Sequence, residues 1–210
     1  MRFANFCKIS TILALSACSA GPSVLADDNG TGRVTVSGIS AGGYAAVQAH
    51  VALSGTISGA AAVAGGPYHC AEGNLVYALG RCISGAALEA APLVEATRSA
   101  AGAGTIDPVE SLSNGRVWLF HGEADPIVNV AVTEALRDFY ASFLPEQAIA
   151  LVDTIPATHG WPTRDQGVAC GEMGGDYINA CDYDAAGELL QHLYGSLSQP
   201  TTAHEESLQV

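Results

Sequence analysis

Short apolar runs alternate along this chain with alanine-rich or amphipathic stretches of helical length. Each apolar run is four to eight residues long, as expected for a buried strand. The runs lie at 57–64, 117–120 and 148–152, and Arg33-Val34-Thr35-Val36 also reads as a short strand. The helical stretches lie at 44–53, 86–101, 128–143 and 185–194. Strands that alternate with helices predict a mostly parallel sheet that is covered by helices on both faces. The run Val117-Trp118-Leu119-Phe120 has no polar position, which fits burial on both sides.

Glycine and proline clusters mark the connections between these elements. We expect a tight turn at 38–43 and irregular loops for the remaining connections. Those loops lie at 68–85, 102–115 and 159–173.

The first 26 residues predict an export signal. Arg2 and Lys8 precede an apolar run at 9–17 that is too short to span a bilayer. The small residues before Asp27 predict ordinary secretory cleavage after Ala26. The run Leu15-Ser16-Ala17-Cys18 instead resembles a bacterial lipoprotein box, which would place a lipid anchor on Cys18. We therefore expect a secreted or periplasmic protein with a signal at 1–26, a catalytic domain at 27–197 and a disordered polar tail at 198–210.

The charge balance excludes the largest classes of binding protein. The 210 residues carry a formal net charge of −13, and only 14 % of them are charged. Removing residues 1–26 takes away two basic residues and no acidic one, which brings the charge to −15. Such a chain has no surplus cations to displace counterions from nucleic acid or to bind an anionic membrane.

The cysteines indicate disulfides. Beyond residue 26 there are four, Cys70, Cys82, Cys170 and Cys181. An even number in an exported chain is typical of disulfide pairing, and three pairings are open. The local pairing, Cys70–Cys82 with Cys170–Cys181, closes two short loops and would stabilise the fold by roughly 3 kcal/mol each. The chain has no CxxC motif and no histidine at ligand spacing from a cysteine pair, so we expect no metal site.

The segment Gly38-Ile39-Ser40-Ala41-Gly42 carries the pattern G-x-S-x-G between a predicted strand and a predicted helix. This is the context of a nucleophile elbow, in which a strained turn exposes the serine hydroxyl. We expect that a Cβ atom on either flanking glycine would clash. The N–H of Ala41, at the start of the helix, would stabilise a developing oxyanion.

A nucleophilic serine needs a base, and the base needs an orienting acid. Asp125 follows the buried strand at 117–120 and is the expected acid, with Glu123 as the lesser candidate. His159 follows the next strand and is the expected base, because its glycine- and proline-rich loop can bring the imidazole over Ser40. Of the other histidines, we expect His121 to shape the acid's loop and His69 to line the mouth of the site. The remaining three, His50, His192 and His204, are expected in solvent.

Four segments together carry a family resemblance. They are VSGISAGGY at 36–44, GGPYHC at 65–70, HGEADPIV at 121–128 and INACDYD at 178–184. Over residues 33–195 the chain resembles secreted poly(3-hydroxybutyrate) depolymerases of the circularly permuted branch. The resemblance implies an α/β-hydrolase fold and a serine esterase that cleaves short-chain hydroxyalkanoate esters without cofactor or metal.

The resemblance also implies roles for single residues. Ser40 matches the nucleophile, Asp125 the acid and His159 the base. Trp161 and Tyr68 are expected to bind substrate, although Trp161 also fits a core or rim aromatic, and we expect Trp118 in the core. In the family, further strands and a His-Gly-Cys segment that resembles a second oxyanion donor lie in a long carboxyl-terminal part. We therefore expect an incomplete sheet here. A truncated, catalytically impaired fragment that binds a polymer or a cell-surface partner, and a feruloyl esterase or cutinase-like enzyme, remain alternatives.

Overall fold

The computed structural model describes residues 32–195 and 197–198, and the account below concerns the compact unit that begins at Arg33. The predicted export signal lies outside the described residues, as does the predicted tail from residue 199 onward. Within the described residues, no helix is both long and apolar enough to cross a membrane.

Four parallel strands form the main sheet, as the pattern of apolar runs predicts. In spatial order these are β1 (Val34–Ile39), β2 (Ile57–Val63), β3 (Arg116–Phe120) and β4 (Ile149–Val152). The register pairs Ile39 with Val63 and Val63 with Phe120, so the carboxyl ends of neighbouring strands lie level. Loops that leave these ends therefore meet at one edge of the sheet.

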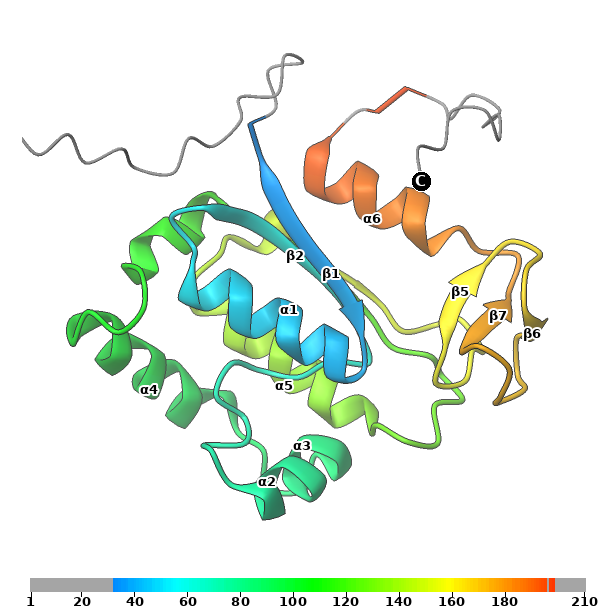
Figure 1. Cartoon of the computed structure of the whole chain (residues 1–210), viewed down its shortest axis with the longest axis horizontal. Helices are drawn as coiled ribbons and strands as arrows, with labels where there is room; N and C mark the ends of the chain where they lie inside the picture. Colours follow the sequence, from blue (N-terminus) through cyan, green and yellow to red (C-terminus); the bar gives the residue numbers. More distant parts are fainter. Residues whose placement is uncertain (1–31, 196, 199–210) are drawn as a thin grey trace, which may run out of the picture. The chain divides into compact units, whose positions relative to one another are not determined.

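Helices cover both faces of this sheet. Alternate residues of β2 and β3 point to opposite faces, and both sets are buried. One face packs against α1 (Ala41–Ala52), α4 (Ala90–Gly102) and α5 (Val130–Ala141), and the other packs against α6 (Ala185–Tyr194). Figure 1 shows α1 and α6 on opposite sides of β1. Trp118 is 2 % exposed in the α6 layer, which confirms its predicted place in the core.

Two segments predicted as irregular contain regular structure. The first holds two short helices, α2 (Leu75–Leu79) and α3 (Arg81–Ser84). Asn74 begins α2 by accepting a hydrogen bond from the N–H of Val76 at 2.8 Å. These helices are too short to carry an amphipathic pattern, which is why the sequence does not predict them. Two 3-10 turns at Val109–Asn114 and Glu146–Ala148 are likewise missed.

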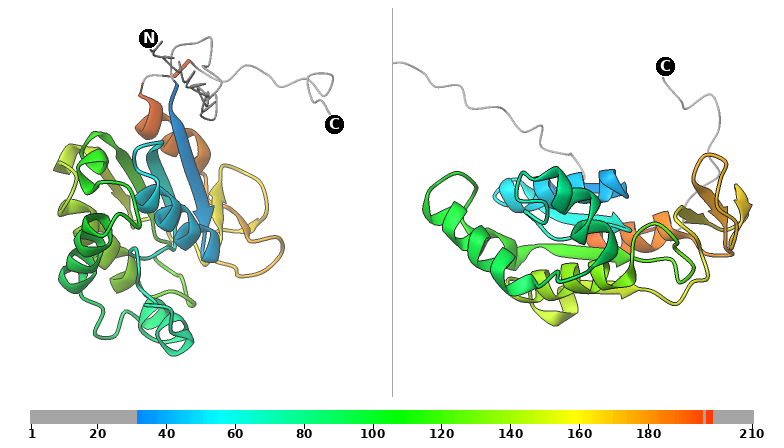
Figure 2. Two further views of the ribbon diagram at one scale, coloured as in Figure 1. Left: turned by 60° about the vertical axis from the view of Figure 1, so that its left-hand side comes forward. Right: turned by 90° about the horizontal axis from the view of Figure 1, so that it is seen from below.

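The second segment contributes to a separate three-stranded sheet. Its strands lie in the spatial order β5 (Trp161–Thr163), β7 (Ile178–Ala180) and β6 (Val168–Ala169). Two further views show this small sheet beside the main one (Figure 2). Strands of two or three residues carry no readable alternation, so the sequence predicts a loop there instead.

The disulfides follow the local pairing. Cys70 is bonded to Cys82, and Cys170 is bonded to Cys181. The first bridge joins α3 to the turn that precedes α2. The second holds the ends of β6 and β7 together.

Two histidines expected in solvent lie inside the fold. His50 on α1 is fully buried, and its Nδ1 lies 2.9 Å from the hydroxyl of Tyr140 on α5. The alanine-rich sequence of α1 hides this role, because the partner lies 90 residues away. His192 is half-buried, and its Nε2 lies 3.1 Å from the carbonyl of Ala148.

Candidate active site

Ser40 occupies the turn between β1 and α1. Its φ of 54° and ψ of −122° place this L-residue in a rarely populated backbone region. The turn is held in place because Ser40 N–H donates to Val63 O at 2.8 Å and Ser40 O accepts from Tyr44 N–H at 3.0 Å. Ser40 makes no capping bond with its side chain. The hydroxyl therefore stays available at the carboxyl edge of the sheet.

The two glycines that flank Ser40 differ in whether they leave room for a side chain. A Cβ atom on Gly38 would lie 2.3 Å from the main-chain carbon of Gly42, so the predicted clash is confirmed there. A Cβ atom on Gly42 would meet nothing within 4 Å, so the predicted clash is wrong at that position. Gly43 is the second crowded position, since a Cβ there would lie 3.0 Å from Val63 O.

Asp125 follows β3 and points into the protein. Its side chain is 1 % exposed, although the residue lies in a surface loop. One carboxylate oxygen accepts hydrogen bonds from the N–H groups of Ile127 at 2.8 Å and Val128 at 3.0 Å. The other accepts from Nδ1 of His159 at 2.8 Å. Burial raises the pKa of Asp125, but the hydrogen bonds from His159, Ile127 and Val128 together bring it below its ordinary value.

His159 follows β4 and is 6 % exposed. An ionised carboxylate only accepts hydrogen bonds, so the contact with Asp125 fixes the proton of a neutral His159 on Nδ1 and leaves Nε2 as the free base. Glu123, the lesser candidate for the acid, is exposed on the same loop. The geometry therefore favours Asp125 over Glu123 as the acid that orients His159.

A second buried histidine lies behind the acid. His121 is 3 % exposed, and its Nδ1 lies 3.2 Å from the hydroxyl of Thr133 on α5. Burial lowers the pKa of His121 despite the nearby carboxylates of Asp125 and Asp153. His121 therefore joins the loop of Asp125 to α5, a contact that the sequence does not predict and that is consistent with the expected role of His121 in shaping this loop.

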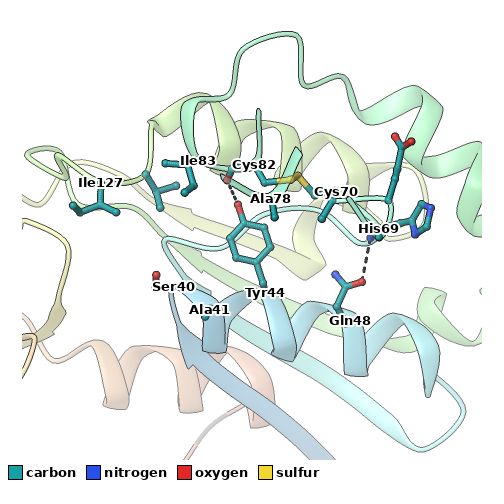
Figure 3. A pocket seen from close by; sticks show the side chains of 14 residues that line it. Ser40, Ala41, Tyr44, Gln48, His69, Cys70, Ala78, Cys82, Ile83 and Ile127 are labelled. Atoms are coloured by element: carbon teal, nitrogen blue, oxygen red, sulfur yellow. Dashed lines mark hydrogen bonds between the residues drawn. A yellow bond between two sulfur atoms is a disulfide. The ribbon is translucent and has the colours of Figure 1, made fainter. Parts of the chain in front are cut away.

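Two cavities open on either side of Ser40. The first, of about 470 Å³, follows α1 along Ala41, Tyr44 and Gln48. Its opposite wall is the segment 68–85, which contains the Cys70–Cys82 disulfide and contributes Ala78 and Ile83 (Figure 3). We call this the disulfide-linked segment. Ser40 lies at one end of this cavity and His69 at the other.

The second cavity, also about 470 Å³, contains both Ser40 and His159. Five further residues complete its lining: Ile39, Ile127, Met173, Asp176 and Tyr177. No hydrogen bond joins Ser40 to His159 within the described residues, and apo enzymes often close this contact only when substrate binds.

Ile127 lines both cavities and escapes sequence reasoning, although it lies only two residues after the acid. Met173, Asp176 and Tyr177 lie in a glycine-rich loop that carries no recognisable motif. Conversely, Trp161 and Tyr68 line neither cavity and pack against the two hydrophobic core clusters instead. Their predicted substrate contacts find no support in the lining of these cavities.

The site contains no cluster of metal ligands. Throughout residues 32–195 and 197–198, no group of three or more histidine, cysteine, aspartate or glutamate side chains is placed to hold a metal ion.

Comparison with known proteins agrees with this arrangement. A scan against protein-family models found no match. The chain is 47 % identical over 173 residues to the poly(3-hydroxybutyrate) depolymerase of Delftia acidovorans, covering 81 % of this chain and 35 % of the relative. It is 32 % identical over 200 residues to the polyhydroxybutyrate depolymerase of Talaromyces funiculosus, covering 93 % of this chain and 58 % of that one.

Solved structures give the same result for the fold. The crystal structure of the PHB depolymerase from Penicillium funiculosum superimposes with a TM-score of 0.75 at 30 % identity, covering 83 % of this chain and 55 % of that one. A PHB depolymerase with serine replaced by alanine, complexed with an R3HB trimer, gives a TM-score of 0.76. The chain thus spans about a third of the bacterial relative and somewhat over half of the fungal ones. By sequence and by α/β-hydrolase fold, it is similar to poly(3-hydroxybutyrate) depolymerases over the part of their length that it spans.

Proposed function

We propose that this chain carries the hydrolytic centre of an exported serine esterase that cleaves poly(3-hydroxybutyrate) or short-chain hydroxyalkanoate esters. The observation that carries the proposal is the 2.8 Å hydrogen bond between buried Asp125 and His159, beside a cavity that Ser40 also lines. The names of the relatives support the substrate class. The two disulfides support export, because such bonds persist in oxidising compartments.

The mechanism is a two-step acyl transfer. Nε2 of His159 takes the proton of Ser40 as Oγ attacks the ester carbonyl. Asp125 holds the imidazole in the required tautomer and stabilises the imidazolium that forms. The tetrahedral intermediate collapses when His159 returns the proton to the leaving alkoxide, and an alcohol departs. Water then attacks the acyl-enzyme with His159 again as base, which releases the acid and restores Ser40.

Ala41 supplies an oxyanion donor in this mechanism. Its N–H is the first of α1 and has no acceptor within the helix. Ala41 lies beside Ser40 in the first cavity, where the oxyanion would form. The positive end of the α1 dipole adds to the stabilisation. One such donor typically contributes 10²–10³ in kcat.

The two cavities give the substrate a direction. His159 protonates the leaving alcohol, so the alcohol half of the ester must lie in the second cavity, on the histidine side. The acyl half then extends along α1 into the first cavity. That cavity is lined largely by apolar groups such as Ala78, Ile83 and Val128. Such a lining suits the methyl-bearing backbone of a hydroxybutyrate unit, because it removes apolar surface from water.

A combined labelling and turnover experiment tests the proposal. The purified chain is treated with a fluorophosphonate and the labelled peptide is identified by mass spectrometry. In parallel, hydrolysis of a 3-hydroxybutyrate trimer is compared with that of a simple aryl ester. We expect one label, on Ser40, and faster cleavage of the trimer. The S40A variant is the matched control and should lose both. Folded protein that neither labels at Ser40 nor cleaves either ester would contradict the proposal.

A further inference from the structure

One buried polar side chain contacts the loop that carries His159, although it is not itself part of the proposed relay of Ser40, His159 and Asp125. Asn179 lies on β7, the middle strand of the small sheet, and is 1 % exposed. It pairs with Pro162 of β5 on one side and with Val168 of β6 on the other. Its amide is shielded from water, so an unpaired polar group there would be costly.

The amide nitrogen of Asn179 holds the residue before His159. It donates to Glu172 O at 2.8 Å and lies 3.3 Å from the hydroxyl oxygen of Thr158. That hydroxyl donates in turn to Glu172 O at 2.8 Å. The N–H of Thr158 is also fixed, because it donates to Cys170 O at 3.1 Å. Thr158 is thus held by both its main chain and its side chain.

The amide oxygen of Asn179 packs against the residue after His159. A Cβ atom on Gly160 would lie 1.7 Å from Oδ1 of Asn179, so only glycine permits this approach. Gly160 N–H donates to Thr158 O at 2.9 Å, which closes a tight turn with His159 at its centre. One side chain therefore contacts both neighbours of the proposed base.

The Cys170–Cys181 disulfide braces the same arrangement. It joins Cys170, whose carbonyl accepts the hydrogen bond from Thr158 N–H, to Cys181, which lies two positions after Asn179. The small sheet, the disulfide and the histidine turn consequently form one connected support. Asn179, Thr158 and the disulfide line neither of the two cavities beside Ser40.

We propose that Asn179 is a positioning residue that sets where the imidazole of His159 lies between Asp125 and Ser40. The proposal rests on the proposed function, since it assigns Asn179 a task in the same relay. A displacement of about 1 Å in such a relay can cost on the order of 10²-fold in rate. The effect falls on kcat, because Asn179 lies outside both substrate cavities.

The test compares Asn179→Ala with a matched control, Thr97→Ala. Thr97 on α4 is also fully buried and donates to a main-chain carbonyl, that of Leu93 at 2.7 Å, but it contacts no part of the site. We expect both variants to lower Tm. Only N179A should lower kcat, by roughly 10²-fold with KM changed by less than about threefold. If the two variants lose activity equally at matched Tm, Asn179 has a structural role only and the proposal is wrong.

An isosteric variant gives a second measurement, the pH dependence of kcat, which a purely structural role of Asn179 would not change. In Asn179→Asp, an ionised carboxylate has no hydrogen to donate to Glu172 O, whereas the protonated acid has one. Burial raises the pKa of such a carboxyl group. The ratio of kcat in N179D to kcat in the wild type should therefore rise as pH falls from about 8 to about 5, and the ratio cancels the titration shared by both proteins. A pH-independent ratio overturns the proposal.

Thr158→Val keeps the test decisive if neither Asn179 variant folds. This variant retains the shape of Thr158 and removes only the hydroxyl that joins Thr158 to Asn179 and to Glu172 O, so we expect about a 10-fold lower kcat at unchanged KM. Unchanged kcat in T158V overturns the proposal. Failure of the proposed function is distinct, because the wild-type chain would then show neither turnover nor a labelled Ser40.

Discussion

The hydroxyl of Tyr44 donates a hydrogen bond to the main-chain carbonyl of Cys82, across the first cavity. Tyr44 lies on α1, one turn after Ser40, while Cys82 belongs to the disulfide-linked segment that forms the opposite wall. Figure 3 shows the tyrosine ring reaching from the helix to that wall. Together with the hydrogen bond from His69 N–H to Gln48 Oε1 at 3.1 Å, this contact sets the spacing between the helix that follows Ser40 and the segment that would enclose the acyl chain.

Replacing Tyr44 by phenylalanine should loosen the cavity and leave the relay intact. The carbonyl of Cys82 loses its partner, so we expect the free energy of unfolding to fall by about 1 kcal/mol. The KM for a hydroxybutyrate trimer should rise several-fold, with kcat within about twofold of wild type.

Tyr194→Phe is the matched control for this substitution. The hydroxyl of Tyr194 lies 2.9 Å from that of Thr35, at the opposite end of β1 from Ser40. This variant should lose similar stability and keep the wild-type KM. An unchanged KM in Y44F, measured by initial rates on the trimer, would show that the bridge does not shape the substrate site.

The arrangement of the proposed relay follows from sequence order, whereas its support does not. Ser40, Asp125 and His159 each follow a strand of a parallel sheet, so their meeting at one edge is dictated by topology. Asn179 lies on a three-residue strand whose partners are no longer than itself, and no periodicity marks it. Its importance depends on a close approach to Gly160 that only the folded chain creates.

Burial of polar residues is the other feature that local pattern misses. His50 looks like a surface residue of an alanine-rich helix, yet it is fully buried and lies 2.9 Å from the hydroxyl of Tyr140 on α5. The disulfide-linked segment similarly looks irregular, because two very short helices cannot show a 3.6-residue repeat.

The two glycines that flank Ser40, the proposed nucleophile, should respond oppositely to alanine. Gly38→Ala places a Cβ atom 2.3 Å from main-chain carbon of Gly42, and main chain cannot move aside cheaply. We expect a loss of about 3 kcal/mol or more of unfolding free energy. Gly42→Ala meets open space inside α1 and should be neutral or stabilising by up to ~1 kcal/mol. Thermal unfolding of both variants measures the difference, and equal destabilisation would contradict the crowded-turn geometry.

Substitutions of Asp125 and Glu123, the two carboxylates of this loop, should have very different effects on kcat. Asp125→Asn no longer fixes the proton of His159 on Nδ1, so we expect kcat to fall by roughly 10³–10⁴-fold. The amide oxygen can still accept from Ile127 and Val128, which should preserve the loop and the fold. Glu123→Gln changes the same charge at an exposed position and should stay within about twofold of wild type. Equal losses in the two variants, measured as kcat on the trimer, would remove Asp125 from its assigned role.

The buried pair of His50 and Tyr140 should make the fold sensitive to mild acid. Burial lowers the pKa of His50 from 6.5 to about 4, and Nε2 of His50 has no hydrogen-bond partner in the described structure. The unfolded chain therefore binds a proton that the folded chain excludes. This contribution to stability is fully present above pH 6.5 and is lost progressively as pH falls toward 4, by about 3 kcal/mol in all.

His50→Asn cannot take up that proton, so its free energy of unfolding should vary much less over this range. Replacing the exposed His69 by asparagine is the control and should retain the wild-type acid dependence. Denaturant unfolding at stepped pH gives the measurement, and identical acid dependence in H50N and wild type would rule out His50 as the source.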